Sequence, residues 1–387
     1  MARCSHLHPM NPDAVTPESE SCRHLVAHHV DERPDNFSIL ASAKRLKDFS
    51  RTHLMGVVGG GIAYLQMIQD GYVWCDHFEN LTLSGAAPTK RSPDFVFSRP
   101  GHSDVAIAES KATHGSWRKP FGRSVRKGYV EQVAPYLGMQ LSGATASHGF
   151  AIGSWMTSPT CAELMIDHTA ISAPATPPGD VPTDPTFVKR GNYLTVLALM
   201  FGASVARGAR AGTWPSPDTT FVVASWLGRE WVVGSYNSSQ TAAVLIEEGY
   251  LGKGVAEPWM LQTNAFALER AIADVVLRSL DDAGGAANLL ADLGPIDDGL
   301  YASARAAGGA VYPDGFAVIG KAEELEQVHV LGWDPNKHQI EEPAMTAVQQ
   351  VETEIAYQLR REFEGSSPEE PKEKSEHPLQ ITLRTAD

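Results

Sequence analysis

Acidic and basic side chains that could act together gather in one stretch of the chain, residues 93–136. Asp94 follows a proline and opens a short apolar run, PDFVF, which is typical of a strand. Glu109 and Lys111 stand two residues apart in a second strand-like run, VAIAESKA. Because successive side chains of a strand point to opposite faces, we expect Glu109 and Lys111 to share one face and Ser110 to point to the other.

A turn that contains Pro100 and Gly101 separates the two runs, and a β-hairpin there would bring Asp94 towards Glu109. Two carboxylates at one end of a hairpin form a site of hard oxygen ligands. Mg²⁺ prefers such ligands, with water and substrate phosphate completing its coordination, and Mn²⁺ accepts a similar set. The cation would lower the pKa of a bound water, while Lys111 could orient that water or pair with the scissile phosphate. The expected chemistry is metal-assisted hydrolysis.

The Pro-Asp pair at 93–94, followed by Glu-x-Lys at 109–111, resembles the signature of the PD-(D/E)XK nuclease superfamily. Gln-x-x-x-Tyr at 132–136 resembles the additional motif of its RecB-type branch. The resemblance covers residues 55–155 and implies an α/β, restriction-endonuclease-like core, in which helices flank a mixed central sheet. Stand-alone proteins of this build often serve in restriction or in bacterial defence against phage, which suggests the same for this chain.

The resemblance also implies roles for individual residues. Asp94 and Glu109 would ligate Mg²⁺, or Mn²⁺ in its place, together with the backbone carbonyl of Ser110. Lys111 would be the catalytic lysine. Gln132 would count among the catalytic residues, on the helix that follows the hairpin, where the additional motif holds the substrate and the site.

One feature departs from the family pattern. Members often carry an acidic residue on the first helix, whereas glycines occupy residues 59–61 of this chain. A third metal ligand would then come from elsewhere, with Asp70, Asp76 and Glu79 as candidates. The missing acid leaves a second interpretation open, a catalytically degenerate scaffold or adaptor subunit of a larger complex. The intact Glu-x-Lys pair disfavours it, since a scaffold has no need of two charges at the end of a strand.

A basic stretch lies between Lys111 and Gln132. Trp117, Phe121 and Tyr129 interleave with its cations, and a basic run mixed with aromatic residues can follow a phosphate backbone and stack a base. The alternative is an ordinary solvated helix face. We expect contact with nucleic acid, DNA ahead of RNA, from Arg118, Lys119, Arg123, Arg126, Lys127 and Tyr136.

The composition sets limits on these interpretations. The 387 residues suggest two or three domains, and 43% hydrophobic residues suffice for a sizeable core. The net charge of −14 disfavours general binding to nucleic acid, so any such binding depends on the local basic stretch. The four cysteines are widely spaced, so we expect no disulfide framework. The sequence has no run of 18 apolar residues, so we expect no membrane span. With no apolar signal core near the N-terminus, we expect a cytoplasmic protein.

We expect five segments along the chain. Residues 1–35 would form a flexible arm, whose Cys and His residues match no strong zinc pattern. Residues 36–156 would form the nuclease-like domain, and 157–187 a Pro-rich linker that is neither helix nor strand. Residues 188–363 would form a C-terminal α+β domain, which could select substrate or bind a protein partner or a second copy. Residues 364–387 would form a disordered acidic tail.

Five further elements are expected along the chain. Two helices over 36–70 would meet at the glycines. In a helix over 119–141, Pro135 would cause a kink or shift the helix boundary. A strand over 148–156 would complete the sheet. In the C-terminal domain, good helical periodicity predicts a helix over 263–282.

Overall fold

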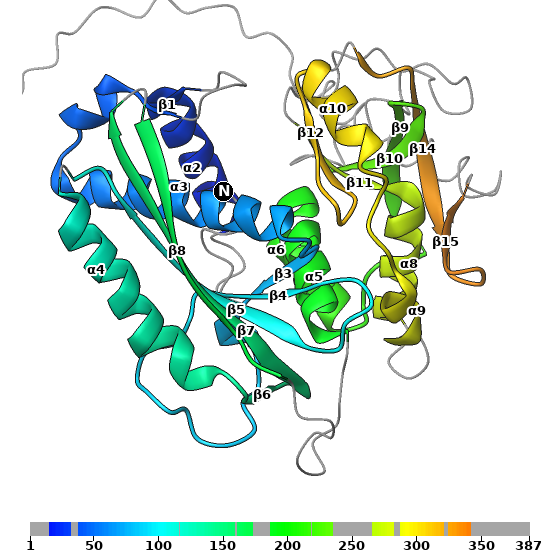
Figure 1. The fold of residues 1–387 in the computed structure, drawn as a ribbon. Helices are drawn as coiled ribbons and strands as arrows, with labels where there is room; N and C mark the ends of the chain where they lie inside the picture. Colours follow the sequence, from blue (N-terminus) through cyan, green and yellow to red (C-terminus); the bar gives the residue numbers. More distant parts are fainter. Residues whose placement is uncertain are drawn as a thin grey trace, which may run out of the picture. The chain divides into compact units, whose positions relative to one another are not determined.

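The described part of the chain is a mixed α/β structure. The computed structural model describes residues 15–31, 38–115, 117–158, 161–172, 186–217, 219–234, 265–281, 287–320 and 324–341. All of them belong to one compact unit, Met1–Pro343, and the second unit, Ala344–Asp387, lies outside the described residues. The unit contains two large sheets with helices packed against them (Figure 1), so the expected α/β class is confirmed at this level.

The first sheet is mixed and has six strands. Its order is β3-β4-β5-β7-β6, and β8 also pairs with β7. β5 and β7 run parallel, and the other neighbours run antiparallel. The strands are β3 (Trp74–His77), β4 (Phe95–Ser98), β5 (Val105–Thr113), β6 (Gln140–Leu141), β7 (Ala144–Ser158) and β8 (Cys161–Ala170).

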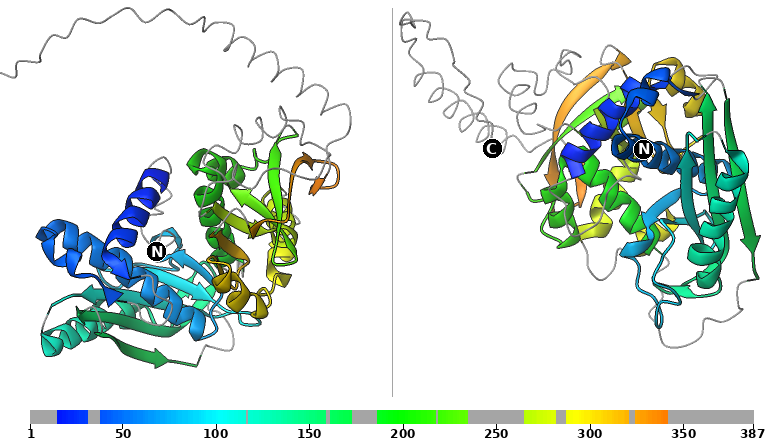
Figure 2. Two further views of the ribbon diagram at one scale, coloured as in Figure 1. Left: turned by 90° about the horizontal axis from the view of Figure 1, so that it is seen from above. Right: turned by 90° about the vertical axis from the view of Figure 1, so that its left-hand side faces the viewer.

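Two helices cover opposite faces of this sheet (Figures 1 and 2). α3 (Asp48–Gln69) packs Tyr64 and Met67 against aromatic residues of β4 and β7. α4 (Arg118–Gly128) packs Phe121 and Val125 into the core on the other face. The hairpin of β4 and β5 and the strand expected over 148–156 are therefore confirmed, and β7 extends beyond the expected strand.

We expected the glycines at 59–61 to separate two helices. This prediction is wrong, because α3 runs through them without a break. Close packing explains why glycine is present: a Cβ on Gly59 would lie 2.5 Å from the Cβ of Ala112 on β5. Glycine in a helix interior costs about 0.5–1 kcal/mol relative to alanine, and contact between α3 and the sheet offsets that cost. Gly59 thus allows the close approach of α3 to β5.

The helix expected over 119–141 is shorter and changes its type. α4 ends at Gly128, a π-helical turn spans Tyr129–Val133, and a 3-10 turn spans Ala134–Tyr136. Pro135 has no N–H to donate to an α-helical ladder, and the α-helical boundary lies before it, at Gly128. The residues of the additional motif are therefore carried by the two irregular turns.

The prediction of a linker without helix or strand over 157–187 is wrong for part of that segment. β8 spans Cys161–Ala170 and pairs with β7 along most of its length. The prolines of this segment lie mainly after residue 173, and apolar residues alternate before them as in a strand. Leu164 and Ile166 point to one face of β8, and Glu163 and Asp167 to the other.

The second sheet has seven antiparallel strands in the order β12-β13-β11-β10-β9-β14-β15. Leu227 and Gly228 connect β9 and β10, and both residues have positive φ, as a tight hairpin requires. The strands are β9 (Thr220–Trp226), β10 (Arg229–Gly234), β11 (Ala265–Glu269), β12 (Ala310–Val311), β13 (Phe316–Ile319), β14 (Gln327–Asp334) and β15 (Gln339–Glu341). The accompanying helices are α5 (Phe187–Phe201), α6 (Ala203–Arg210), α8 (Arg270–Asp281), α9 (Ala287–Asp292) and α10 (Gly299–Ala306).

The helix expected over 263–282 is partly wrong, since its first residues form β11 and α8 begins at Arg270. Glu269 marks the change: its carboxylate accepts a hydrogen bond from the N–H of Ile272 (3.0 Å) and so caps the helix. The end of the expected C-terminal domain, residues 342–363, and the expected tail over 364–387 lie outside the described residues.

Polar contacts from α5 join the first sheet to a turn of the second. The Trp74 indole donates to the hydroxyl of Tyr193 (3.2 Å), which donates to the carbonyl of Asp314 (3.0 Å). The amide of Asn192 donates to the carboxylate of Asp314 (2.8 Å) and accepts from the N–H of Cys75 (3.1 Å). α5 thus belongs to the same hydrophobic core as β3, although we expected it to begin a separate domain.

The expected N-terminal arm contains regular structure where it is described. α2 (Val15–His29) is followed by β1 (Val30–Asp31), which pairs with β2 (Ser38–Ile39). Cys22 is buried in this region. Of the other cysteines and histidines of this arm, His24, His28 and His29 lie on α2, and Cys4, His6 and His8 lie outside the described residues. Within the described ranges, no helix has the length and apolar character needed to cross a bilayer.

Candidate active site at the end of the β4–β5 hairpin

The hairpin brings Asp94 and Glu109 together, as the sequence predicts. Phe95 pairs with Ala108, and the N–H of Asp94 donates to the carbonyl of Ala108 (3.1 Å), which places Asp94 beside Glu109. The carboxylate of Asp94 accepts a hydrogen bond from the N–H of Ser110 (2.8 Å). That contact holds the carboxylate against the strand that carries Glu109.

The expected division of side chains between the two faces of β5 is also present. A Cβ on Gly128 of α4 would lie 3.2 Å from Lys111 and 3.4 Å from Glu109, so both side chains lie on the α4 side. The hydroxyl of Ser110 faces Gly59 of α3 on the other side. Lys111 Nζ contacts Glu109 Oε1 in an ion pair, in which the glutamate side chain is buried and the lysine is one-third exposed.

Burial raises the pKa of both carboxyl groups, and the charge of Asp94 adds to the effect on Glu109. Desolvation and the charge of Asp94 raise the pKa of Glu109 to about 7, against the opposing effects of Lys111 and the nearby Gln132 amide. Desolvation also raises the pKa of Asp94, while the Ser110 N–H and the Lys111 ammonium lower it. Two buried carboxylates in contact are costly when both are ionised. A single lysine leaves the pair with excess negative charge.

This arrangement fits a divalent cation. Glu109 Oε2 is buried and has no hydrogen-bond partner within 3.5 Å among the described residues. A buried carboxylate oxygen without a donor loses its hydration, and a cation shared with Asp94 would replace it. The donor set is hard oxygen, which suits Mg²⁺ or Mn²⁺. Asp94 and Glu109 are therefore the residues that could hold such an ion, with Lys111 beside them.

None of the proposed third acids completes a three-ligand cluster. Across the described ranges, no group of three or more His, Cys, Asp or Glu side chains is arranged to hold a metal ion. Asp76 is buried and accepts from the N–H of His77 (2.8 Å), and burial raises its pKa to about 6. Asp70 lies at the end of α3, where the Gln66 amide donates to it (3.2 Å). Glu79 is exposed but close enough to Asp94 for its charge to raise the pKa of Asp94.

Gln132 and Tyr136 both hold the segment that leads into β4. The Gln132 amide donates to the carbonyl of Ser92 (3.0 Å) and lies near Glu109. The hydroxyl of Tyr136 donates to the carbonyl of Arg91 (3.1 Å). Tyr136 is only 1% exposed, so the expected contact with nucleic acid is wrong for this residue. Its ring packs against Phe78, and its role in the structure is to position the segment before Asp94.

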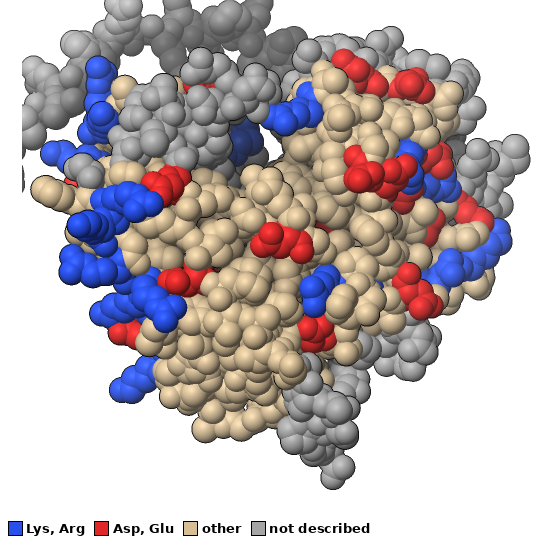
Figure 3. Space-filling view, in the orientation of Figure 1, with Lys and Arg blue, Asp and Glu red and all other residues tan. Residues whose placement is uncertain are grey.

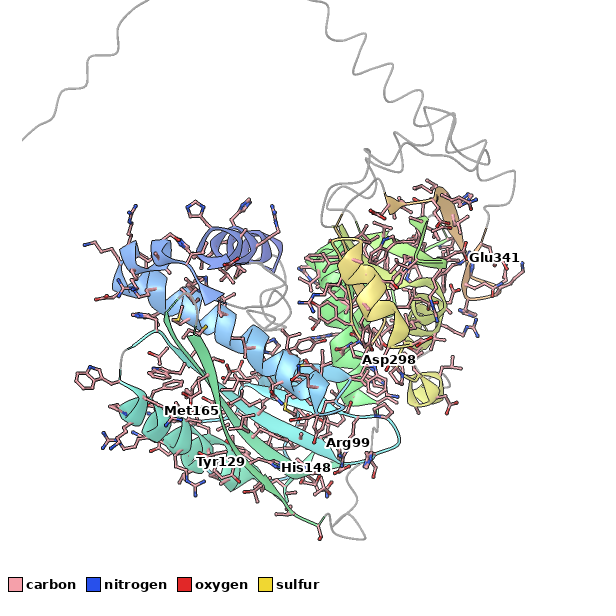
Figure 4. All side chains as sticks on the ribbon, turned by 45° about the horizontal axis from the view of Figure 1, so that its top comes forward. Arg99, Tyr129, His148, Met165, Asp298 and Glu341 are labelled. Carbon is pink, nitrogen blue, oxygen red and sulfur yellow. The ribbon has the colours of Figure 1, made fainter. Side chains whose placement is uncertain are left out.

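The basic stretch is exposed along α4, but acids compensate part of its charge (Figure 3). Sequence reasoning missed these acids because most of them come from β8, which we had read as a linker. Met165 of β8 lies beside α4, 3.6 Å from the position that a Cβ on Gly122 would occupy (Figure 4). The ion pairs are Arg118 with Glu163, Arg126 with Asp167 (3.4 Å) and Lys127 with Glu131 (3.7 Å).

The aromatic residues of the stretch differ from the expectation. Phe121 and Tyr129 are buried, 7% and 5% exposed, because they pack into the core under α4. Trp117 is 77% exposed. The expected aromatic surface is therefore wrong for Phe121 and Tyr129. Only helical periodicity along this stretch could have distinguished the buried aromatic residues from the exposed one.

A second polar cluster, which the sequence did not indicate, lies at the opposite end of the hairpin. Arg99 and His148 are neighbours there (Figure 4), with 3.3 Å between Nη2 and Nε2. Asp104 lies 3.7 Å from Arg99 and accepts from the hydroxyl of Ser147. His148 also contacts His168 of β8 (3.3 Å). This cluster surrounds one carboxylate with cations and imidazoles, and it takes no part in the site around Glu109.

Comparisons with known proteins identify no relative of this chain. No protein-family model, no curated protein and no solved structure matches the chain.

The carboxylate pair predicts a pH dependence of folding in metal-free protein. Glu109 has an ordinary pKa of 4.5 and a folded pKa of about 7. Between these values the folded protein keeps a proton that the unfolded chain releases. The contribution of Glu109 to the free energy of unfolding is therefore fully present below pH 4.5 and is lost as pH rises towards 7. We expect a loss on the order of 1–3 kcal/mol. Urea unfolding in EDTA at pH 4.5 and 7.5 measures it, and Glu109→Gln, which cannot titrate, should reduce it. Equal losses in the two proteins would contradict the assignment.

Proposed function

We propose that this chain is a metal-dependent nuclease of the PD-(D/E)XK type, which hydrolyses phosphodiester bonds in nucleic acid. The supporting observation is the pair of buried carboxylates, Asp94 and Glu109, with Lys111 on the same face of the same strand as Glu109. Burying two like charges in contact destabilises a fold unless a cation compensates them. Binding of a divalent ion would remove this destabilisation.

In this proposal the residues of the hairpin act in a defined order. Asp94 and Glu109, with the Ser110 carbonyl, would hold Mg²⁺ or Mn²⁺, which would supply an acidified water and neutralise charge on the phosphate. With the Glu109 carboxylate engaged in this way, the Lys111 ammonium would be free to address the attacking water or the phosphate. Gln132 is a positioning residue, since it lies between Glu109 and the Ser92 carbonyl.

A second candidate function is a catalytically degenerate scaffold with a restriction-endonuclease-like core. The observation that favours it is the lack of a third acid beside Asp94 and Glu109 within the described residues. A site with two carboxylates can still hold Mg²⁺, because this ion usually keeps several waters and uses one or two carboxylates. We therefore place the nuclease first.

The substrate that we propose is DNA ahead of RNA, in a cytoplasmic protein that serves restriction or defence against phage. The basic face of α4 supports contact with a polyanion, because it carries Lys119 and Arg123 in addition to the cations that form ion pairs. The second sheet would supply substrate selection, or contact with a protein partner or a second copy.

The wild-type protein tests the proposal directly. Labelled single-stranded and double-stranded DNA and RNA are incubated with Mg²⁺, with Mn²⁺ and with EDTA. We expect cleavage of at least one substrate in either metal and none in EDTA. Intact substrates in all metal-containing reactions, at micromolar protein, would favour the scaffold.

A further inference from the structure

Trp117 is an unusual residue for the surface of a folded protein. Its side chain is 77% exposed, although tryptophan is the largest apolar side chain and is highly buried on average. It lies at the N-terminus of α4, directly before Arg118, and its backbone is extended. The two other aromatic residues of the stretch are buried, so the exposed indole is not part of a continuous apolar core.

Two cations that follow Trp117 in the first half of α4 are available to a ligand. Lys119 and Arg123 are exposed and one helical turn apart, and neither forms an ion pair with another described residue. Arg118, by contrast, is held by Glu163, with Nε 2.9 Å from the carboxylate. The start of α4 therefore presents an aromatic face and two uncompensated positive charges.

The same helix connects this surface to the carboxylate pair. α4 is 11 residues long, which corresponds to about 16 Å at 1.5 Å per residue. Gly128, at its other end, approaches Lys111 and Glu109. Trp117 and the carboxylate pair therefore lie near opposite ends of the same helix.

We propose that Trp117, Lys119 and Arg123 form a binding site for single-stranded nucleic acid, in which the indole stacks on an unpaired base. Stacking on an exposed aromatic ring requires a free base face, which a single strand offers and an intact duplex keeps within its own stack. The two cations contact the backbone phosphates. The inference deepens the proposed function and rests on it, because it names the form of nucleic acid that enters along α4.

Binding without cleavage tests this site separately from catalysis. Fluorescence anisotropy in EDTA would follow labelled 12-nucleotide oligo(dT), oligo(U) of the same length and a 12-base-pair DNA duplex, with the full chain. We expect tighter binding of one or both single strands than of the duplex. Trp117→Ala should weaken single-strand binding by about five- to a hundred-fold, and Trp117→Phe should weaken it less, because the smaller ring still stacks.

Phe49 provides a matched control, because this aromatic side chain is 79% exposed on α3 and has no part in the proposed site. Phe49→Ala should leave the affinity unchanged, and circular dichroism should show that all variants fold. Equal affinity for single strand and duplex, no binding to any probe, or unchanged binding by Trp117→Ala would each overturn the inference.

The results separate this inference from the proposed function. Binding that depends on Trp117, in a protein that cleaves nothing in Mg²⁺ or Mn²⁺, would support the single-strand site and refute the nuclease. Cleavage that depends on Glu109, with binding indifferent to Trp117, would support the nuclease and refute the single-strand site. Comparison of the affinities for oligo(dT) and oligo(U) shows whether the bound single strand is DNA or RNA.

Discussion

Glu109→Gln is expected to lower the rate of Mg²⁺-dependent cleavage by about a thousand-fold or more. Glutamine keeps the size of the side chain but removes the negative charge that would hold the cation and contact the Lys111 ammonium. Asp94 alone would then hold the ion weakly, and the water bound to the ion would be less well placed. The same variant should fold as stably as the wild type in EDTA, or more so, because it relieves the repulsion from Asp94.

A matched control separates this effect from the loss of any ion-paired glutamate. Glu230 forms an ion pair with Arg270 (2.7 Å) on the second sheet, and Glu230→Gln should leave cleavage within about two-fold of wild type, since such an exposed pair contributes little to stability. Initial rates are measured on the substrate that the wild type cleaves best. Comparable rates in wild type and Glu109→Gln would show that any cleavage occurs elsewhere or comes from a contaminant.

Lys189→Met is expected to destabilise the protein by about 2–4 kcal/mol. Lys189 is 8% exposed and lies on α5, with its ammonium 4.0 Å from the centre of the Trp74 ring. Nζ donates three hydrogen bonds at the C-terminal end of α9, to the carbonyls of Leu290 (2.8 Å), Ala291 (2.8 Å) and Leu293 (2.9 Å). Methionine would fill the space but leave these carbonyls without their donor, where water has little access.

Lys337→Met is the control for this prediction. Lys337 pairs with Glu341 and Asp334 near β15 and is largely exposed, so its loss should change the free energy of unfolding by less than about 1 kcal/mol. Both variants are measured by urea unfolding with a common m-value. A Lys189→Met protein as stable as the wild type would mean that water replaces the ammonium at the end of α9.

The hairpin was predictable because its signals are local. A period of two places Glu109 and Lys111 on one face of β5, and the turn between the runs fixes the register that brings Asp94 to them. The positions of Asp94, Glu109 and Lys111 follow from residues less than twenty apart in sequence. The pKa of Glu109 does not, because it depends on burial under α4 and on a neighbour across the hairpin.

Long-range packing accounts for the errors. The glycines at 59–61 resemble a break between helices, and only the close approach of Ala112 shows why they lie within one. β8 has weak strand signals of its own and is fixed by pairing with β7, so its acids could not be placed opposite the basic stretch. Tyr136 is buried by the irregular turns at the end of α4, which depend on the fold around Pro135.

Crystals soaked in Mn²⁺ offer the most direct measurement of the central claim, since anomalous scattering locates this ion independently of activity. The account predicts one strong anomalous peak about 2.1 Å from carboxylate oxygens of both Asp94 and Glu109, with Lys111 Nζ moved away from Glu109. The peak should be lost in crystals of Glu109→Gln. Saturating Mn²⁺ that leaves the two carboxylates without a peak between them, and Lys111 still paired with Glu109, would contradict the account.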